Sequence, residues 1–320
     1  MNRELEIRKY LSVIKRAVSL IETLLQDSDD GLLEQMLQKE EVPAIKPELT
    51  TQIPQTNLKR NDQHVAARLK HVQDLKAIDC WPEAVPSQII NVSEQDQISR
   101  ANAVLDMMLD RSVENMTFLD FGCGEGWMAH EILSRGVAKS FGYDIVEHEL
   151  WSKHKGAKYT TEINDLPKNY FDIIMLYDVL DHVNDPINVM KTVRNCLKQN
   201  GSVYVRCHPW TSRHATHLFK KGINKAYWHL FLTQSEIAAD LKEPVIFTRM
   251  EIDPIQAYHW WFNEFEIKKE VMIKESVSEF FFVPAFKELL AGEQEIPLEE
   301  IGNFLSLMEV QFVDYFLKLK

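Results

Sequence analysis

Three glycines at alternate positions, Gly122, Gly124 and Gly126, constrain this chain more than any other feature of its sequence. They follow a short apolar run, 117–121, and precede a helical stretch, so the loop is predicted to end a strand and begin a helix. Glycine lets the backbone turn tightly and lets a ligand approach where a Cβ would exclude it. A second apolar run ends in Asp144, whose carboxylate can accept hydrogen bonds from both hydroxyls of a ribose. The loop is therefore predicted to hold an adenosine-type cofactor.

The spacing of the glycines and the acid before them favour one cofactor over another. Dinucleotide sites use G-x-G-x-x-G, whereas this loop reads G-x-G-x-G and has Trp127 at the next position. Asp120 would repel a pyrophosphate, but it suits the amino group of a bound amino acid. Together these features indicate S-adenosylmethionine.

Short apolar runs alternate with helical stretches after Ser93, which forms a predicted capping box with Asp96. Strands separated by helices need crossover connections, so we expect a mostly parallel sheet that is covered on both faces. The expected strands are 117–121, 140–144, 158–162, 171–177, 202–207, 245–252 and 265–274.

The two ends of the chain are expected to be helical extensions. Residues 1–40 form a helical segment with coiled-coil spacing, which leaves self-association and intramolecular packing both open. Residues 41–62 read as a linker, 63–275 as the core with helices before it, and 276–320 as a C-terminal helical extension. The apolar positions with heptad-like spacing are Ile7, Leu11, Ile14, Val18, Ile21 and Leu25 at one end, and Ile301, Leu305, Met308, Phe312, Tyr315 and Leu319 at the other.

Composition excludes several classes of protein. The net charge of −12 argues against coating nucleic acid by bulk charge, and the four scattered cysteines fit a reducing compartment. The charged N-terminus and the absence of a long apolar run predict a cytoplasmic protein without a membrane span.

Over about residues 95–275 the ordered series of motifs resembles the class I S-adenosylmethionine-dependent methyltransferases. Besides the glycine loop, the resemblance includes Glu162-Ile163, a fourth strand over 171–177 and the Asp178–Val183 segment that follows it. It implies a Rossmann-like α/β fold with a seven-stranded, mostly parallel sheet and helices on both faces. It also implies a set of donor-binding residues: Asp120, Gly122, Cys123, Gly124, Gly126, Asp144, Ile145, Glu162, Ile163 and Tyr177.

An acid-x-x-acid-His segment follows the fourth predicted strand. A helix is expected to start where that strand ends, which would place Asp178, Asp181 and His182 on one of its faces. The pattern resembles the ubiquinone-pathway O-methyltransferases and the small-RNA 3′-terminal 2′-O-methyltransferases, in which such a segment binds a divalent ion. The resemblance implies Mn²⁺ or Mg²⁺, which would lower the pKa of an acceptor hydroxyl. Ordinary helix capping is the alternative.

The stretch between Pro186 and Ser235 contains no acidic residue but many basic and aromatic ones. The part that follows the fifth strand is expected to overhang the active site, where cations would hold a phosphate or carboxylate. His208 or His229 is a candidate general base or metal ligand. Together with His182 and Tyr177 they form the predicted catalytic set.

The predicted function is methyl transfer from S-adenosylmethionine to an oxygen, or a nitrogen, of an anionic acceptor such as a nucleotide, an RNA end or a sugar diol. A carboxylated or phenolic small molecule is the alternative acceptor. A non-catalytic scaffold that retains the domain is the alternative from another class, and the N-terminal helix would make it a homo-oligomer.

Overall fold

The computed structural model describes residues 56–86, 93–109, 111–183, 185–239 and 256–320. The predicted N-terminal helical segment and the strand expected over 245–252 lie outside these residues. Residues from His64 to Lys320 form one compact unit. Helix α3, Thr56–Lys76, begins inside the stretch expected to be a linker. None of the described helices is both long and apolar enough to cross a bilayer.

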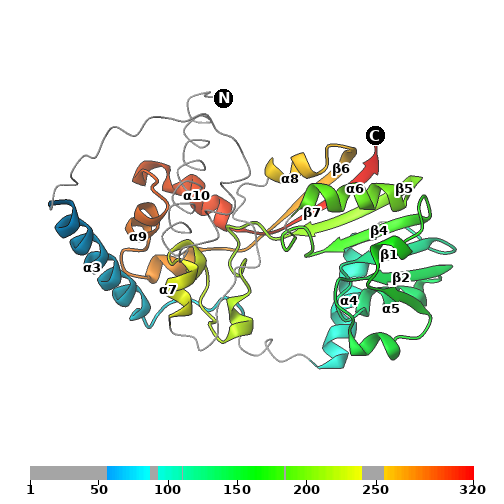
Figure 1. The fold of residues 1–320 in the computed structure, drawn as a ribbon, viewed down its shortest axis with the longest axis horizontal. Helices are drawn as coiled ribbons and strands as arrows, with labels where there is room; N and C mark the ends of the chain where they lie inside the picture. Colours follow the sequence, from blue (N-terminus) through cyan, green and yellow to red (C-terminus); the bar gives the residue numbers. More distant parts are fainter. Residues whose placement is uncertain (1–55, 87–92, 110, 184, 240–255) are drawn as a thin grey trace, which may run out of the picture. The chain divides into compact units, whose positions relative to one another are not determined.

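Seven strands form one sheet in the order β3-β2-β1-β4-β5-β7-β6 (Figure 1). The five strands from β3 to β5 are parallel, and β7 is antiparallel to both of its neighbours. The predicted mostly parallel sheet is thus confirmed. The strands are β1 Thr117–Phe121, β2 Lys139–Tyr143, β3 Ala157–Thr160, β4 Phe171–Tyr177, β5 Leu197–Cys207, β6 Phe265–Lys274 and β7 Val310–Leu319.

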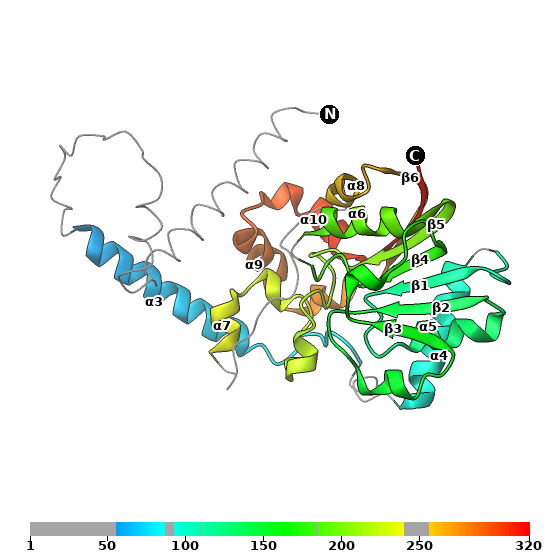
Figure 2. The ribbon, with the colours of Figure 1, turned by 45° about the vertical axis from the view of Figure 1, so that its right-hand side comes forward.

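Alternate residues of the central strands fill cores on opposite faces of the sheet. On one face, Leu119 of β1 and Ile174 of β4 pack with the helices α6, Pro186–Cys196, and α8, Gln256–Trp261. On the other face, Phe118 of β1 and Ile173 of β4 pack with α4, Glu94–Met108, and with Ile132, which follows α5, Trp127–Glu131. Figures 1 and 2 show α6 and α8 on one side of the sheet and α4 and α5 on the other. Helices cover both faces because successive side chains of a strand point to opposite sides.

The order of the strands reverses at β1 and β4, which lie side by side in the middle of the sheet. From β1 the chain moves outward through β2 and β3, and from β4 it moves the other way through β5. In open α/β sheets, ligands bind at the carboxyl ends of the strands next to such a reversal. The loops after β1 and β4 are therefore the place to look for a site.

The heptad-like spacing predicted helix throughout the C-terminal extension, but the extension ends in a strand. Helix α9, Phe286–Glu293, and helix α10, Ile301–Met308, are followed by β7, which is inserted between β5 and β6. Val313, Tyr315 and Leu317 are buried on one face of β7, whereas Phe316 packs on the other. This period of two belongs to a strand with neighbours on both sides. The prediction of helix beyond Met308 was wrong: positions 315 and 319 are four apart and fit both periods, whereas Phe312 lies on the opposite face of the strand.

A second hydrophobic core lies outside the sheet, and we call it the cap. It combines α3, the segment around Trp81, the chain between Trp210 and Ile237, and the chain between Val277 and Met308. The ring of Trp81 makes edge contacts with Phe231, Phe280 and Phe286 at centroid distances of 5.0, 6.0 and 6.3 Å. Its remaining α-helix is α7, Gln234–Ala238. The short 3-10 turns of the described residues are Ile132–Arg135, Glu149–Ser152, Ile163–Asp165, Leu218–Lys221, Trp228–Leu230, Ser278–Phe282 and Leu298–Glu300.

Candidate active site

The loop after β1 has the conformation that its glycines predict. Gly122, Gly124 and Gly126 have φ values of 79°, 51° and 85°, in the left-handed region that favours glycine. The N–H groups of Gly122 and Cys123 donate to the carbonyl of Tyr143 at 2.7 and 2.9 Å. The loop is thereby joined to the end of β2.

Two of the glycines are required by packing, and one leaves open space. A Cβ on Gly122 would lie 2.4 Å from a methyl carbon of Val179, and one on Gly126 would lie 2.6 Å from the ring of Tyr159. A Cβ on Gly124 would meet nothing within 4 Å. The open side of Gly124 is thus where a ligand can approach the backbone closely.

Asp144 braces the loop and stands at the end of β2, as predicted. Its Oδ2 accepts a hydrogen bond from the N–H of Gly124 at 2.8 Å, and its Oδ1 accepts one from Val146 at 3.2 Å. Ile145, beside it, is 81 % exposed, and Ile163, which follows the neighbouring β3, is 39 % exposed. Exposed apolar side chains at these two strand ends fit the flat face of an adenine ring, and Glu162 next to them is exposed to solvent.

Asp120 is the second predicted acid of the loop, and it is buried. No hydrogen-bond partner of its Oδ2 is present among the described residues. Burial, and next the charge of Asp144, raise the pKa of Asp120 to about 7. A ligand ammonium would give this oxygen a partner and favour the charged carboxylate. Asp120 therefore fits the ammonium at the methionine end of S-adenosylmethionine. The open side of Gly124 leaves room for this ligand to approach the backbone closely.

The segment after β4 is a turn and not the predicted helix. Asp178 has a φ of 56°, the N–H of His182 donates to Val179 in a turn, and α6 begins only at Pro186. Asp185 caps α6 by accepting from the N–H of Asn188, and a proline is favourable in the first turn because its missing N–H is not needed there. The prediction that Asp178, Asp181 and His182 share one helix face was therefore wrong.

The turn instead brings two acids to the chain that leaves β5. Oδ1 of Asp178 lies 3.1 Å from Nε2 of His208, and Oδ2 of Asp181 accepts a hydrogen bond from the backbone N–H of His208 at 3.1 Å. Val179, next to Asp178, is the residue that packs on Gly122. The pair of Asp178 and His208 thus lies beside the glycine loop.

Three further imidazole rings gather around this pair. His214 and His217 lie 4.9 and 5.8 Å from His208 between ring centroids, and His182 lies 5.2 Å from His217. Phe312, from β7, packs on His208 at 4.2 Å. We call these four histidines the histidine cluster. Within the described ranges, no three His, Cys, Asp or Glu side chains form a group that could hold a metal ion.

Tyr177 ends β4 between two arginines. Its hydroxyl lies 3.5 Å from Nη2 of Arg100, in α4, and the guanidinium of Arg206 stacks on its ring at 5.3 Å. Arg206 is buried and donates twice to Asp314 at 2.5 Å. Arg100 forms no ion pair within the described part of the chain. The sequence analysis missed Arg100, since its position on the polar side of a helix carries no signal of its own.

His229 lies away from this site, in the cap. Its Nε2 is 2.7 Å from the carbonyl of Trp210, and the side chain is buried. This contact is typical of a core histidine, so the structure does not bring His229 together with Tyr177, His182 and His208.

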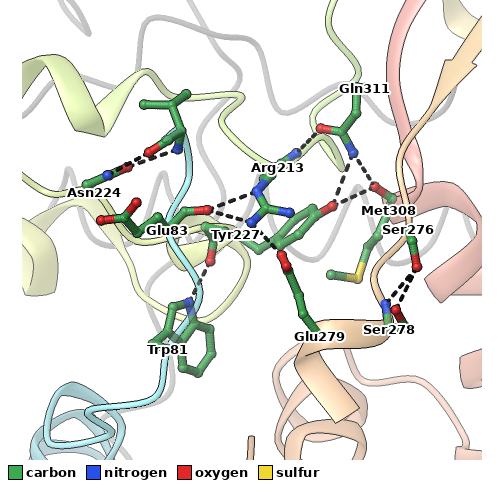
Figure 3. Close-up of polar contacts among 12 residues, drawn as sticks. Trp81, Glu83, Arg213, Asn224, Tyr227, Ser276, Ser278, Glu279, Met308 and Gln311 are labelled. Atoms are coloured by element: carbon green, nitrogen blue, oxygen red, sulfur yellow. Dashed lines mark hydrogen bonds and ion pairs between the residues drawn. The ribbon is translucent and has the colours of Figure 1, made fainter. Parts of the chain in front are cut away.

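Arg213, from the basic stretch, joins separate segments of the cap (Figure 3). Its guanidinium donates to the carbonyl of Glu83 at 2.9 and 2.7 Å and pairs with Glu279, while its backbone N–H donates to Gln311. Nearby, the hydroxyl of Tyr227 donates to the carbonyl of Met308 at 2.8 Å. The cap is thus fixed to the start of β7, whose Phe312 touches the histidine cluster.

Comparisons with known proteins find similar domains and chains. A family described as "Methyltransferase domain" matches residues 93–266. The chain is 24% identical over 168 residues to a ubiquinone biosynthesis O-methyltransferase of Acinetobacter baylyi, covering 44% of this chain and 69% of that one. It is 27% identical over 142 residues to the enzyme of that name from Neisseria meningitidis, covering 38% and 59%. A solved S-adenosylmethionine-dependent methyltransferase from Archaeoglobus fulgidus superposes with a TM-score of 0.46 at 14% identity, covering 69% of this chain and 94% of that one.

The family match spans more than half of the chain, which therefore belongs to the methyltransferase domain family. With its seven-stranded sheet and its glycine loop, the chain is a class I S-adenosylmethionine-dependent methyltransferase.

Proposed function

We propose that this enzyme methylates a hydroxyl oxygen of an anionic acceptor, and that His208 takes the proton of that hydroxyl. The observation that carries the proposal is the contact of 3.1 Å between Nε2 of His208 and the carboxylate of Asp178, beside the donor loop. The relatives from Acinetobacter and Neisseria are named O-methyltransferases, which supports oxygen over nitrogen.

Several side chains are proposed to hold the donor. Asp120 binds its ammonium, Arg100 its carboxylate and Asp144 its ribose, while Ile145 and Ile163 flank its adenine. When bound, S-adenosylmethionine supplies an electrophilic methyl group on a positively charged sulfur. The protein orients the acceptor oxygen and excludes water. Orientation contributes most to lowering the barrier when two reactants must be aligned for a displacement.

Asp178 supports His208 in the proton transfer. Its Oδ1 lies 3.1 Å from Nε2, and we propose that its charge stabilises the imidazolium that forms when Nδ1 takes the proton of the hydroxyl. General-base catalysis of this kind contributes about 10² to 10⁴ in rate. The three residues predicted to bind a divalent ion have separate contacts: Asp178 pairs with His208, Asp181 accepts the backbone N–H of His208, and His182 lies against His217. The proposed proton transfer uses no metal ion.

The negative charge proposed for the acceptor rests on the basic residues that follow β5. Arg206 and Arg213 of the basic stretch pair with Asp314 and Glu279. Lys220 and Lys221 are exposed and follow Phe219, whose ring packs on His214 and His217, and these lysines are the cations proposed to hold a phosphate or carboxylate. A phenolic or carboxylated small molecule is a second candidate, because the relatives are named for O-methyl transfer in the biosynthesis of ubiquinone, a small molecule.

A donor-binding titration and an acceptor screen test the proposal. Calorimetry with S-adenosylhomocysteine is expected to show binding by the full chain. Transfer of a labelled methyl group is then followed over nucleotides, RNA ends, sugar diols and phenolic acids. His208→Asn is expected to lower kcat about 100-fold without changing the affinity for S-adenosylhomocysteine.

His259→Asn is the matched control for this variant. His259 is exposed and contacts Glu270 at the far edge of the sheet, so its loss should leave kcat unchanged. A chain that fails to bind S-adenosylhomocysteine would favour the scaffold. Full activity in His208→Asn would remove the proton-transfer role, as would transfer only to nitrogen.

A further inference from the structure

Gly124, at the centre of the glycine loop, is held through both of its backbone polar groups by side chains. The N–H of Gly124 donates to Asp144, and the carbonyl of Gly124 accepts from the indole Nε1 of Trp151 at 2.8 Å. The carbonyl of Gly126 accepts from the hydroxyl of Tyr159 at 3.0 Å. Two successive glycine carbonyls are thus bonded to aromatic side chains that follow β2.

These two aromatic side chains form one rigid unit. The rings of Trp151 and Tyr159 stack at a centroid distance of 5.1 Å with an angle of 13° between their planes. Both are half-buried, and Tyr159 is fixed within β3. A Cβ on Gly142 of β2 would lie 2.5 Å from the Tyr159 ring, so that glycine makes room for it. The aromatic unit therefore fills the space between the sheet and the loop.

A glycine loop needs such support more than other loops do. Glycine loses more conformational freedom on folding than any other residue, and three of them alternate here. If the loop samples other conformations, the apparent dissociation constant for the donor equals the intrinsic constant divided by the fraction of molecules whose loop can bind. Hydrogen bonds to the carbonyls at 124 and 126 restrict that sampling directly.

We propose that Trp151 and Tyr159 are positioning residues of the donor site, which hold the glycine loop in the conformation that binds S-adenosylmethionine. They act through the backbone of Gly124 and Gly126. The proposal rests on donor binding by this loop, as in the proposed function.

Two substitutions separate the hydrogen bonds from the packing. Trp151→Phe and Tyr159→Phe each keep an aromatic ring in the stack but remove the N–H or the O–H. Each is expected to weaken the binding of S-adenosylhomocysteine, measured by calorimetry, about fivefold. Hydrogen–deuterium exchange should become faster in the peptide that contains residues 120–127, with exchange in α4 unchanged.

Two matched controls address a merely structural effect. Trp260→Phe changes a tryptophan that is 69 % exposed, and Tyr170→Phe changes a half-buried tyrosine with edge contacts to Phe141 and Phe171. Neither control should alter affinity or loop exchange. The thermal midpoints of all four variants show whether they fold, and the two test variants are independent of each other.

The outcomes distinguish this inference from the proposed function. If the wild type does not bind S-adenosylhomocysteine, the proposed function fails first. If the wild type binds and both folded test variants bind equally well, with unchanged loop exchange, then only the positioning role is overturned. A loss of affinity in the controls as large as that in the test variants would overturn it too.

Discussion

Two regions of the proposed active site are built over very different distances along the chain. We call the glycine loop with its contacts the donor side, and the histidine cluster with the segments of β5, β7 and the cap beside it the acceptor side. On the donor side, Gly124 bonds to Asp144 and Trp151, 20 and 27 residues away. On the acceptor side, Arg206 bonds to Asp314 across 108 residues, and the hydroxyl of Tyr227 bonds to Met308 across 81. The hydrogen bonds that hold the glycine loop thus lie between β1 and β3, whereas the acceptor side requires the C-terminal strand to be in place.

The largest effect is expected at the buried charge pair of the acceptor side, Arg206 with Asp314. Asp314→Ala leaves the buried guanidinium of Arg206 without its carboxylate, which should lower the free energy of unfolding by about 3–5 kcal/mol. Urea unfolding followed by circular dichroism measures it. The double variant Arg206→Met with Asp314→Leu should recover much of the loss, since no charge then remains buried. If Asp314→Ala is as stable as the wild type, the pair of Arg206 and Asp314 does not stabilise the fold.

The same contrast explains which parts of the structure could be predicted from the sequence. The loop after β1 is encoded by residues that are adjacent in the chain, because glycines, a preceding strand and an acid ending the next strand specify it locally. The capping box of Ser93 and Asp96 is likewise local, and the structure confirms it. Short-range patterns therefore predicted both the α/β sheet and its donor loop.

The parts that were missed depend on neighbours that are distant in the chain. Residues 310–319 could be helix or strand by spacing alone, and pairing with β5 and β6 decides for strand. The spacing of Asp178, Asp181 and His182 suits a helix face, but α6 begins only at Pro186, after its cap Asp185, and these residues lie in a turn. The contacts of Asp178 and Asp181 with His208 follow from the pairing of β4 with β5, which no local pattern gives.

A second prediction concerns the pH dependence of the donor side. The pKa of Asp120 is raised from 3.8 to about 7, so the folded chain keeps this proton where the unfolded chain loses it. Folding is therefore penalised increasingly as the pH rises from about 4 to 7, by about 4 kcal/mol at most. Asp120→Asn should raise the thermal midpoint over wild type by much more at pH 8 than at pH 5, and it should weaken S-adenosylhomocysteine binding.

Asp106→Asn is the control for this pH dependence. The side chain of Asp106 is 71 % exposed and pairs with Arg135, so its replacement should shift the thermal midpoint little, and equally at pH 5 and pH 8. If Asp120→Asn shows the same flat difference, the carboxyl is not protonated in the free enzyme. Tighter donor binding by Asp120→Asn would contradict its proposed contact with the ammonium.

The smallest effect on stability is expected at Gly124, within a matched pair of loop variants. Gly126→Ala places a Cβ 2.6 Å from the ring of Tyr159 at a φ of 85°, which should cost about 2–3 kcal/mol of folding free energy. Gly124→Ala meets open space and should cost only about 1 kcal/mol, for the positive φ alone. Yet Gly124→Ala should abolish S-adenosylhomocysteine binding, because its methyl group occupies the side from which the donor approaches. Urea unfolding and calorimetry on both variants separate packing from binding within one loop. A Gly124→Ala protein that binds normally would mean that the donor approaches the loop elsewhere.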